Sequence, residues 1–190
     1  MSLPTQQKIL SIARHELAVH GFEGLRMRTL STLSGVAPSV LYYHFSNKED
    51  LLKSLYETTN SELGEARKAL KMPDDFEHAL KQRILFQFDH AEEITAVLKY
   101  YLHFRLQFIQ NSRGYLPEKT YLHIEEILQL GEEKGLYNFP DRKRESRVIV
   151  HAINGFILEY FPSIMAKKEK GELVDTLSDF ILRAISTYQV

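Results

Sequence analysis

Two tyrosines and a histidine stand together in the segment GVAPSVLYYHFSNKEDLL, residues 35–52. Tyr42, Tyr43 and His44 can all donate hydrogen bonds to phosphate oxygens, and their rings can pack on sugars and on thymine methyl groups. Residues 38–45 contain no lysine or arginine, so any positive charge must come from neighbouring segments. These three side chains are therefore candidates for contact with a nucleic-acid backbone.

Cationic residues flank this segment on both sides. Arg26 and Arg28 precede it, and Lys48 follows it at the expected N-terminus of a long helix, where backbone N–H groups also attract anions. Residues 1–56 contain six Lys or Arg against four Asp or Glu, whereas the whole chain contains 24 against 25. The N-terminal part is therefore the part suited to an anionic partner.

The composition excludes several other kinds of site. The chain has no cysteine, which rules out disulfides and thiolate zinc sites. The segment HELAVH at residues 15–20 is one residue longer than a zinc-protease HExxH motif, so its two histidines face different directions on a helix. No nucleophile elbow or glycine-rich phosphate loop is present. We expect a protein that is not an enzyme, with no catalytic residues, no metal and no cofactor.

The location of the protein follows from similar reasoning. The N-terminus lacks an apolar core followed by a cleavage site. No apolar run looks long enough to span a bilayer. We therefore expect a cytoplasmic protein without a membrane partner.

Helical spacing of apolar residues along the chain predicts an all-α fold of nine helices. Gly21 ends the first helix, and the short second and third helices meet at Gly35, with Leu30 and Leu33 of the second helix pointing inward. A capping box, Asn47 with Asp50 or Ser46 with Glu49, opens the fourth. The expected ranges are 5–20, 27–34, 38–45, 48–70, 74–90, 92–111, 117–135, 141–168 and 172–188.

The second helix, the glycine turn and the third helix have the dimensions of a helix-turn-helix, whose second helix lies in the major groove. Here the sequence strongly resembles the TetR-like family of bacterial transcriptional repressors over about residues 5–56. The resemblance is carried by Gly21-Phe22, Leu30, Gly35-Val36, Leu41-Tyr42-Tyr43-His44-Phe45, Lys48 and Leu51-Leu52.

The resemblance implies a homodimeric DNA-binding protein with a small-molecule pocket in its C-terminal helices. It divides the chain into a helix-turn-helix DNA-binding domain, residues 1–47, and a ligand-binding and dimerisation domain, residues 48–190. By position, it places these residues on or facing DNA: Arg28, Pro38, Ser39, Val40, Tyr42, Tyr43, His44 and Lys48.

The sequence departs from the family pattern just before the second helix. Many relatives have a threonine or serine there, which caps the helix and binds phosphate, whereas this chain has Leu25-Arg26-Met27. We expect Arg26 to replace that phosphate contact. Pro38 and Val40 have no side-chain donor or acceptor, so direct reading of bases should depend heavily on Arg28.

Aromatic residues are concentrated in residues 84–110. Most should be core, but the resemblance places the ligand cavity in this region. The candidates for its lining are Tyr100, Phe104, Phe108, Tyr121 and His123. An aromatic lining with few charges suits a small apolar or planar compound.

The last two helices carry an apolar stripe too wide for a single contact, so part of it can face a second subunit. Phe180 and Ile181 are adjacent and about 100° apart on a helix, so one should be core and the other interface. The candidates for the dimer interface are Ala152, Gly155, Leu177, Phe180, Ile181 and Ala184.

Together these features predict a homodimeric transcriptional regulator, a repressor, that binds double-stranded operator DNA and is released by an unidentified small-molecule effector. Whether the effector releases DNA or promotes binding is open from the sequence. One alternative is a helical small-molecule-binding or interaction protein whose DNA-binding module is vestigial, which would bind every DNA weakly. A small all-α enzyme is a more distant alternative, because no paired base and nucleophile is present.

Overall fold

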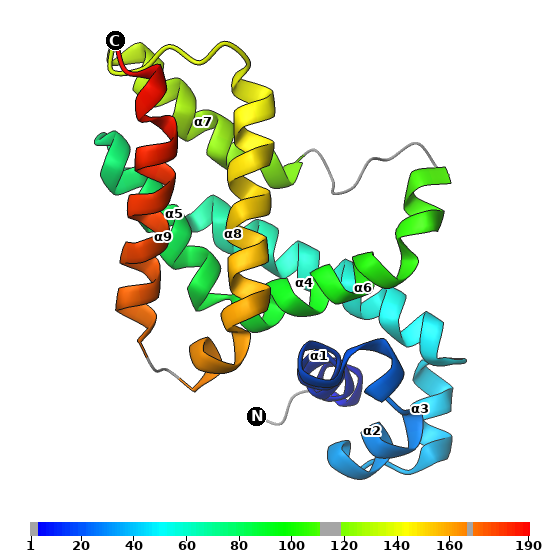
Figure 1. Ribbon diagram of the computed structural model, residues 1–190. Helices are drawn as coiled ribbons and strands as arrows, with labels where there is room; N and C mark the ends of the chain where they lie inside the picture. The colour runs from blue at the N-terminus through cyan, green and yellow to red at the C-terminus, as the bar shows by residue number, and fades with distance from the viewer. Residues whose placement is uncertain (1–3, 111–118, 167–168) are drawn as a thin grey trace. The chain divides into compact units, whose positions relative to one another are not determined.

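The computed structural model describes residues 4–110, 119–166 and 169–190, apart from the side chains of residues 106–110 and 119. In these residues the secondary structure is helical except for one isolated bridge, between Tyr137 and Gln189. The prediction of an all-α fold is confirmed (Figure 1). The helices are α1 Thr5–Gly24, α2 Met27–Ser34, α3 Pro38–His44, α4 Lys48–Ala69, α5 Phe76–Asp89, α6 Ala91–Gln110, α7 Lys119–Glu133, α8 Arg142–Met165, α9 Lys170–Ile185 and the 3₁₀ helix η1 Ser186–Tyr188.

The helices group into two compact units. The first contains residues 1–70 and 92–110, and so α1 to α4 with α6. The second contains residues 71–91 and 111–190, and so α5 with α7 to α9. The boundary predicted after residue 47, between a DNA-binding domain and a ligand-binding domain, stays a prediction. In the structure α4 packs against α1 within the first unit, so the compact units do not divide at that residue.

The first unit is built on an apolar core shared by α1 to α4. Gly21 has a φ of 68°, which a residue with a Cβ rarely adopts, so the regular part of α1 ends there and the chain turns toward α2. The core side chains with at most 5% exposure include Ile9, Leu10, Ala13, Leu17, Ala18, Leu25, Leu30, Leu41, Phe45, Leu51, Leu52 and Leu55.

Polar contacts connect α6 to α1 in the same unit. Arg14 of α1 forms ion pairs with Glu62 of α4 and, at 3.2 Å, with Glu93 of α6. Lys99 Nζ donates a hydrogen bond to the carbonyl oxygen of Ala18 at 2.6 Å. This bond satisfies one of the carbonyls that the end of a regular helix leaves open.

The second unit is a helical bundle in which α5, α7, α8 and α9 pack on one another. Asp75 and Asp141 cap α5 and α8 by accepting hydrogen bonds from the backbone N–H groups of His78 and Arg144. Figure 1 shows α8 and α9 side by side, and they are in contact.

The expectation that no apolar run could span a bilayer needs one correction. Among the described helices, α8 is long and apolar enough to cross a membrane by length and composition alone. The core helix of a soluble protein meets the same test. Ile149, Val150, Ile153 and Ile157 of α8 are buried within the second unit, and 39% of the apolar stretch of α8 is buried in all.

Candidate nucleic-acid interface

Helix α3 presents almost all of its surface to solvent. Of its seven residues only Leu41 is buried, and Phe45 directly after it is buried as well. Tyr43 is 85% exposed, and Tyr42 and Val40 are also exposed. A short helix with uncovered aromatic side chains gains little from them within its own chain, so this face is suited to a partner.

The turn between α2 and α3 is fixed by backbone and hydroxyl hydrogen bonds. Gly35 has φ 64° and ψ 26°, the left-handed conformation that commonly ends a helix. The N–H of Val36 donates to the carbonyl of Ser31 at 3.2 Å, and Ser31 Oγ donates to the carbonyl of Val36 at 2.6 Å. This exchange holds α3 in a fixed direction relative to α2.

The inward face of α2 differs from the prediction. Leu30 is buried as expected, but Leu33 is 52% exposed, so its inward placement was wrong. Ser31 and Ser34 are buried instead, and Ser34 Oγ donates to the carbonyl of Leu30 at 2.5 Å. Because backbone carbonyls in the same turn satisfy these hydroxyls, the short side chains can occupy a core position.

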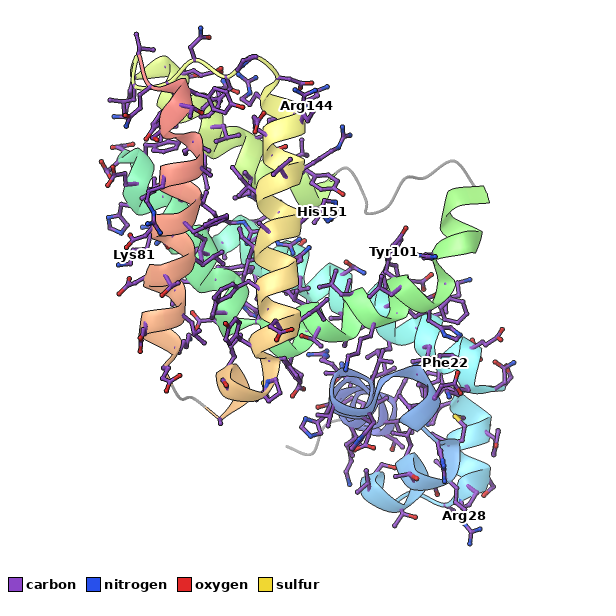
Figure 2. The ribbon with its side chains drawn as sticks, viewed as in Figure 1. Phe22, Arg28, Lys81, Tyr101, Arg144 and His151 are labelled. Carbon is purple, nitrogen blue, oxygen red and sulfur yellow. The ribbon has the colours of Figure 1, made fainter. Side chains whose placement is uncertain are left out.

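The predicted DNA-contacting residues lie on α2, on α3 and at the start of α4, all within the first unit. Arg26 is the N-cap residue of α2, and its side chain makes no capping hydrogen bond. Figure 2 shows Arg28 pointing away from the helices. The exposed members of the predicted set are Arg26, Arg28, Pro38, Ser39, Val40, Tyr42 and Tyr43, while His44 and Lys48 are half-buried.

Lys48 is held by contacts that the sequence did not indicate. Its Nζ donates a hydrogen bond to the carbonyl of Phe22 and lies 3.9 Å from the centroid of the Phe22 ring. Burial lowers the pKa of Lys48, the charge of Glu23 raises it, and the charge of Arg26 lowers it. Arg26 and Lys48 are thus close enough for their charges to repel, and a phosphate group near both would relieve that repulsion.

The start of α4 is organised by the capping pair of Asn47 and Asp50. Asn47 Oδ1 accepts the backbone N–H of Asp50 at 2.9 Å, and the Asp50 carboxylate accepts the N–H and Oγ of Ser46 at 2.9 and 3.0 Å. These hydrogen bonds lower the pKa of Asp50. The Asp50 carboxylate already lies at the N-terminus of α4 and weakens the attraction of its backbone N–H groups for a phosphate. The cationic side chain of Lys48 therefore attracts a phosphate more strongly than those N–H groups do.

The five predicted ligand-binding residues divide between the two units. In the first unit, Tyr100 stacks on Tyr56 with ring centroids 4.5 Å apart and lies 4.7 Å from Phe104. Phe104 is nearly buried and meets Phe22 edge to face at 5.9 Å. Both residues therefore pack against other aromatic rings of their own unit. The side chain of Phe108 lies outside the described residues.

The other two candidates lie on α7 in the second unit. Tyr121 is buried, and its hydroxyl is 3.3 Å from His151 Nε2 on α8. His123 Nδ1 is 3.6 Å from a carboxylate oxygen of Glu126 on the same helix. The role of these five residues in ligand binding stays a prediction.

Four of the six predicted dimer residues line a groove of about 440 Å³ between α8 and α9. Ala152 and Gly155 line it from α8, and Phe180 lines it from α9 with 56% of its surface exposed. A Cβ added to Gly155 would meet nothing within 4 Å, so the groove is open above it. Ala184 is exposed one turn further along α9.

Two residues of the predicted dimer set are buried within the second unit, and the dimer interface itself stays a prediction. Ile181 is 2% exposed and therefore belongs to the core of its own subunit. Leu177 is also buried, so a partner subunit can contact it only at the bottom of the groove, which it lines. Of the adjacent pair, Phe180 is thus the residue available to a partner.

Sequence reasoning missed two residues of α6 that contact the end of α1. Lys99 donates to the carbonyl of Ala18, and the His103 ring stacks on the Phe22 ring with centroids 3.4 Å apart. Ala18 and Lys99 are 81 positions apart, and no periodicity or motif in the sequence connects such distant positions.

Comparison with known proteins supports the helix-turn-helix geometry. Residues 9–55, from α1 into α4, match a family model described as bacterial regulatory proteins of the tetR family. The chain is also similar to the HTH-type transcriptional repressor NicS of Pseudomonas putida. The two are 27% identical over 202 residues, which cover 95% of this chain and 92% of that protein.

Solved structures share the whole fold. The fatty acid degradation regulator FadR of Bacillus halodurans superposes with a TM-score of 0.70 at 23% identity, covering 96% of each chain. FadR of Bacillus subtilis, solved in complex with stearoyl-CoA, gives a TM-score of 0.67 at 19% identity, covering 92% of this chain and 96% of that one. At these identities the likeness establishes a common fold.

Proposed function

We propose, from the premise that the chain is a TetR-like regulator, that it is a homodimeric transcriptional repressor that binds operator DNA and is released by a small-molecule effector. It would act in the cytoplasm and catalyse no reaction. The DNA-contacting part is the helix-turn-helix of α2 and α3, and the effector and dimer contacts belong to the helices that follow.

The exposed face of α3 is the observation that carries this proposal. Tyr42 and Tyr43 are uncovered in the chain, whereas Leu41 and Phe45 fix the helix from behind. A helix of this kind can enter a major groove of about 12 Å width, where its hydroxyl groups reach phosphates. Arg28 projects from the preceding helix, and its guanidinium matches the O6 and N7 acceptors of a guanine.

The dimer proposal is supported by the open groove between α8 and α9. Phe180 and Val148 are both more than half exposed, and Gly155 permits close approach of another helix. In a two-fold interface each subunit would insert the same residues into its partner, so each contact occurs twice. Two subunits would then present their α3 helices to half-sites about 34 Å apart.

The effector that we propose is small and mainly apolar or aromatic. Its support is the aromatic character of α6, which carries Tyr100, Phe104 and Phe108, with Tyr121 and His123 of α7 as further candidates for contact. FadR of Bacillus subtilis was solved with stearoyl-CoA, whose acyl chain is long and apolar, so compounds with a long acyl chain are the first to test. An effector acts only if it binds the DNA-free conformation more tightly.

Selection of genomic fragments by the purified protein tests the proposal, beginning with the DNA upstream of its own coding sequence. The proposal predicts that one or a few fragments with a two-fold symmetric site are retained at physiological salt. Addition of the effector should release them. Equal, weak retention of all fragments, and only at low salt, would instead favour a vestigial DNA-binding module.

A further inference from the structure

The ring of Phe22 connects α6 to the start of α4. The imidazole of His103 lies almost parallel to it, at an interplanar angle of 12° and a centroid separation of 3.4 Å. Lys48 Nζ lies over the same ring, 3.9 Å from its centroid. Because the imidazole covers one face of the ring, the ammonium occupies the opposite face. The three side chains therefore form a stack: His103, Phe22, Lys48 (Figure 2 labels Phe22 at the end of α1).

The stack restricts the side chain of Lys48. Its ammonium is fixed by the carbonyl oxygen of Phe22 and by the negative face of the Phe22 ring. An ammonium has three N–H donors, and the carbonyl uses one of them. The remaining donors can bind an anion without a further search through lysine rotamers, which otherwise carries an entropy cost on binding.

The position of the Phe22 ring depends on α6. Phe22 follows Gly21, where the backbone leaves the helical conformation. His103 covers its face, and Phe104 meets it edge to face at 5.9 Å. His103 is itself exposed, so its replacement leaves no cavity in the core.

We propose that His103 is a positioning residue for DNA binding: through Phe22 it holds the ammonium of Lys48 ready to meet a phosphate group. The proposal rests on the proposed DNA-binding function and adds a residue of α6 that lies outside the helix-turn-helix. It also gives α6 a direct physical connection to the DNA-contacting part of the chain.

The test compares three single variants of the full-length protein and repeats His103→Ala in a Lys48→Ala background. His103→Ala removes the stack, and His103→Phe retains a flat ring in the same place. Leu102→Ala is the control, because Leu102 is the adjacent residue of α6 and is 41% exposed. Each variant is titrated onto a duplex that the wild type retains and onto an unrelated duplex, at several salt concentrations. Far-UV circular dichroism and thermal melting check that the fold is intact.

The stack occurs once in each subunit, and aromatic and cation–π contacts are individually modest. We expect His103→Ala to bind the retained duplex about tenfold more weakly. His103→Phe should recover most of that loss, and Leu102→Ala should bind like the wild type. In a Lys48→Ala background, His103→Ala should have almost no further effect, because the group that it positions is gone.

Three results would overturn the proposal: His103→Ala with wild-type affinity, His103→Phe as weak as His103→Ala, or losses from His103→Ala and Lys48→Ala that add in full. If His103 had a purely structural role, His103→Ala would lower the melting temperature. It would also weaken DNA binding by the same factor in the wild-type and Lys48→Ala backgrounds. If the wild type discriminates no duplex, the proposed function itself fails. If the wild type discriminates and the variants match it, only the role of His103 fails.

Discussion

The contrast between two adjacent residues of α9 gives a direct test of the proposed dimer. Phe180 is 56% exposed beside the groove, whereas Ile181 is 2% exposed and faces the core. Phe180→Asp should therefore disrupt association with little effect on the folded subunit. Ile181→Ala should destabilise the subunit and leave the interface in place.

The size of each effect follows from these exposures. A phenylalanine side chain has about 200 Å² of surface to bury, so roughly 100 Å² remains for a partner. At about 25 cal/mol per Å², this burial contributes about 2.5 kcal/mol per subunit, and about 5 kcal/mol for the symmetric pair. Without it, the dimer should be about 10³- to 10⁴-fold weaker. Ile181→Ala should lower the free energy of unfolding by about 2–5 kcal/mol.

Sedimentation velocity over a range of micromolar concentrations measures association, and far-UV circular dichroism during heating measures stability. Phe180→Asp should sediment as a monomer, keep its helical signal and lose binding to a duplex that the wild type retains. Ile181→Ala should remain a dimer and melt at a lower temperature. If Phe180→Asp remains dimeric and binds DNA normally, the dimer surface lies elsewhere and the assignment of α8 and α9 is wrong.

Three further predictions concern charge. Lys48→Ala should weaken binding to every duplex about equally. It should also reduce the slope of log K against log salt by about 0.9 for each phosphate group that Lys48 neutralises. An unchanged slope would exclude a contact between Lys48 and phosphate. Arg28→Ala should relax specificity at one base pair in each half-site by about 1–3 kcal/mol, and full retention of base preference would leave Arg28 as a surface or phosphate residue. Partial burial lowers the pKa of His151 below its ordinary value of 6.5 although the residue is exposed, so the folded state binds the proton slightly less readily than the unfolded state. The contribution of neutral His151 to stability is therefore complete above pH 6.5 and is lost as the pH falls through the lowered pKa. Over that pH range the His151→Gln variant should lose less stability than the wild type. Equal losses in calorimetric melts would refute this.

The sequence was a good guide to the helices because their ends are chemically marked. Gly35 ends α2 where a break was expected, in the left-handed conformation, and Asn47 accepts the predicted hydrogen bond from Asp50. The range of α2 was predicted to the residue. Such local signals depend on neighbours within a few positions, so they can be recognised without any tertiary contact.

Which side of a helix faces inward was less predictable. Leu33 was expected in the core, but Ser31 and Ser34 occupy it, because backbone carbonyls nearby in the chain satisfy their hydroxyls. Phe180 and Ile181 are both apolar, and only the packing of α9 on α5 and α8 decides between them. Hydrophobicity alone does not rank two adjacent apolar residues.

Contacts between distant segments could not be predicted at all. The stack of His103 on Phe22 depends on how α6 lies against the end of α1, and neither residue type indicates the other. Tyr100 and Phe104 were predicted as ligand contacts from their aromatic character, yet their rings pack on Tyr56, on Phe22 and on each other. An aromatic side chain can serve packing or ligand binding equally well, so residue type alone does not separate the two roles.

The claim that α3 reads operator DNA is tested most directly by comparing the affinity for a selected duplex with the affinity for an unrelated duplex at physiological salt. Fluorescence anisotropy should be measured for the wild type and for a Tyr42→Ala, Tyr43→Ala double variant, whose exposed positions leave the core intact. The wild type should prefer the selected duplex by about 10³-fold or more, and the double variant should lose most of that preference while remaining a folded dimer. A wild type that binds both duplexes with equal, weak affinity would contradict the claim that α3 reads operator DNA.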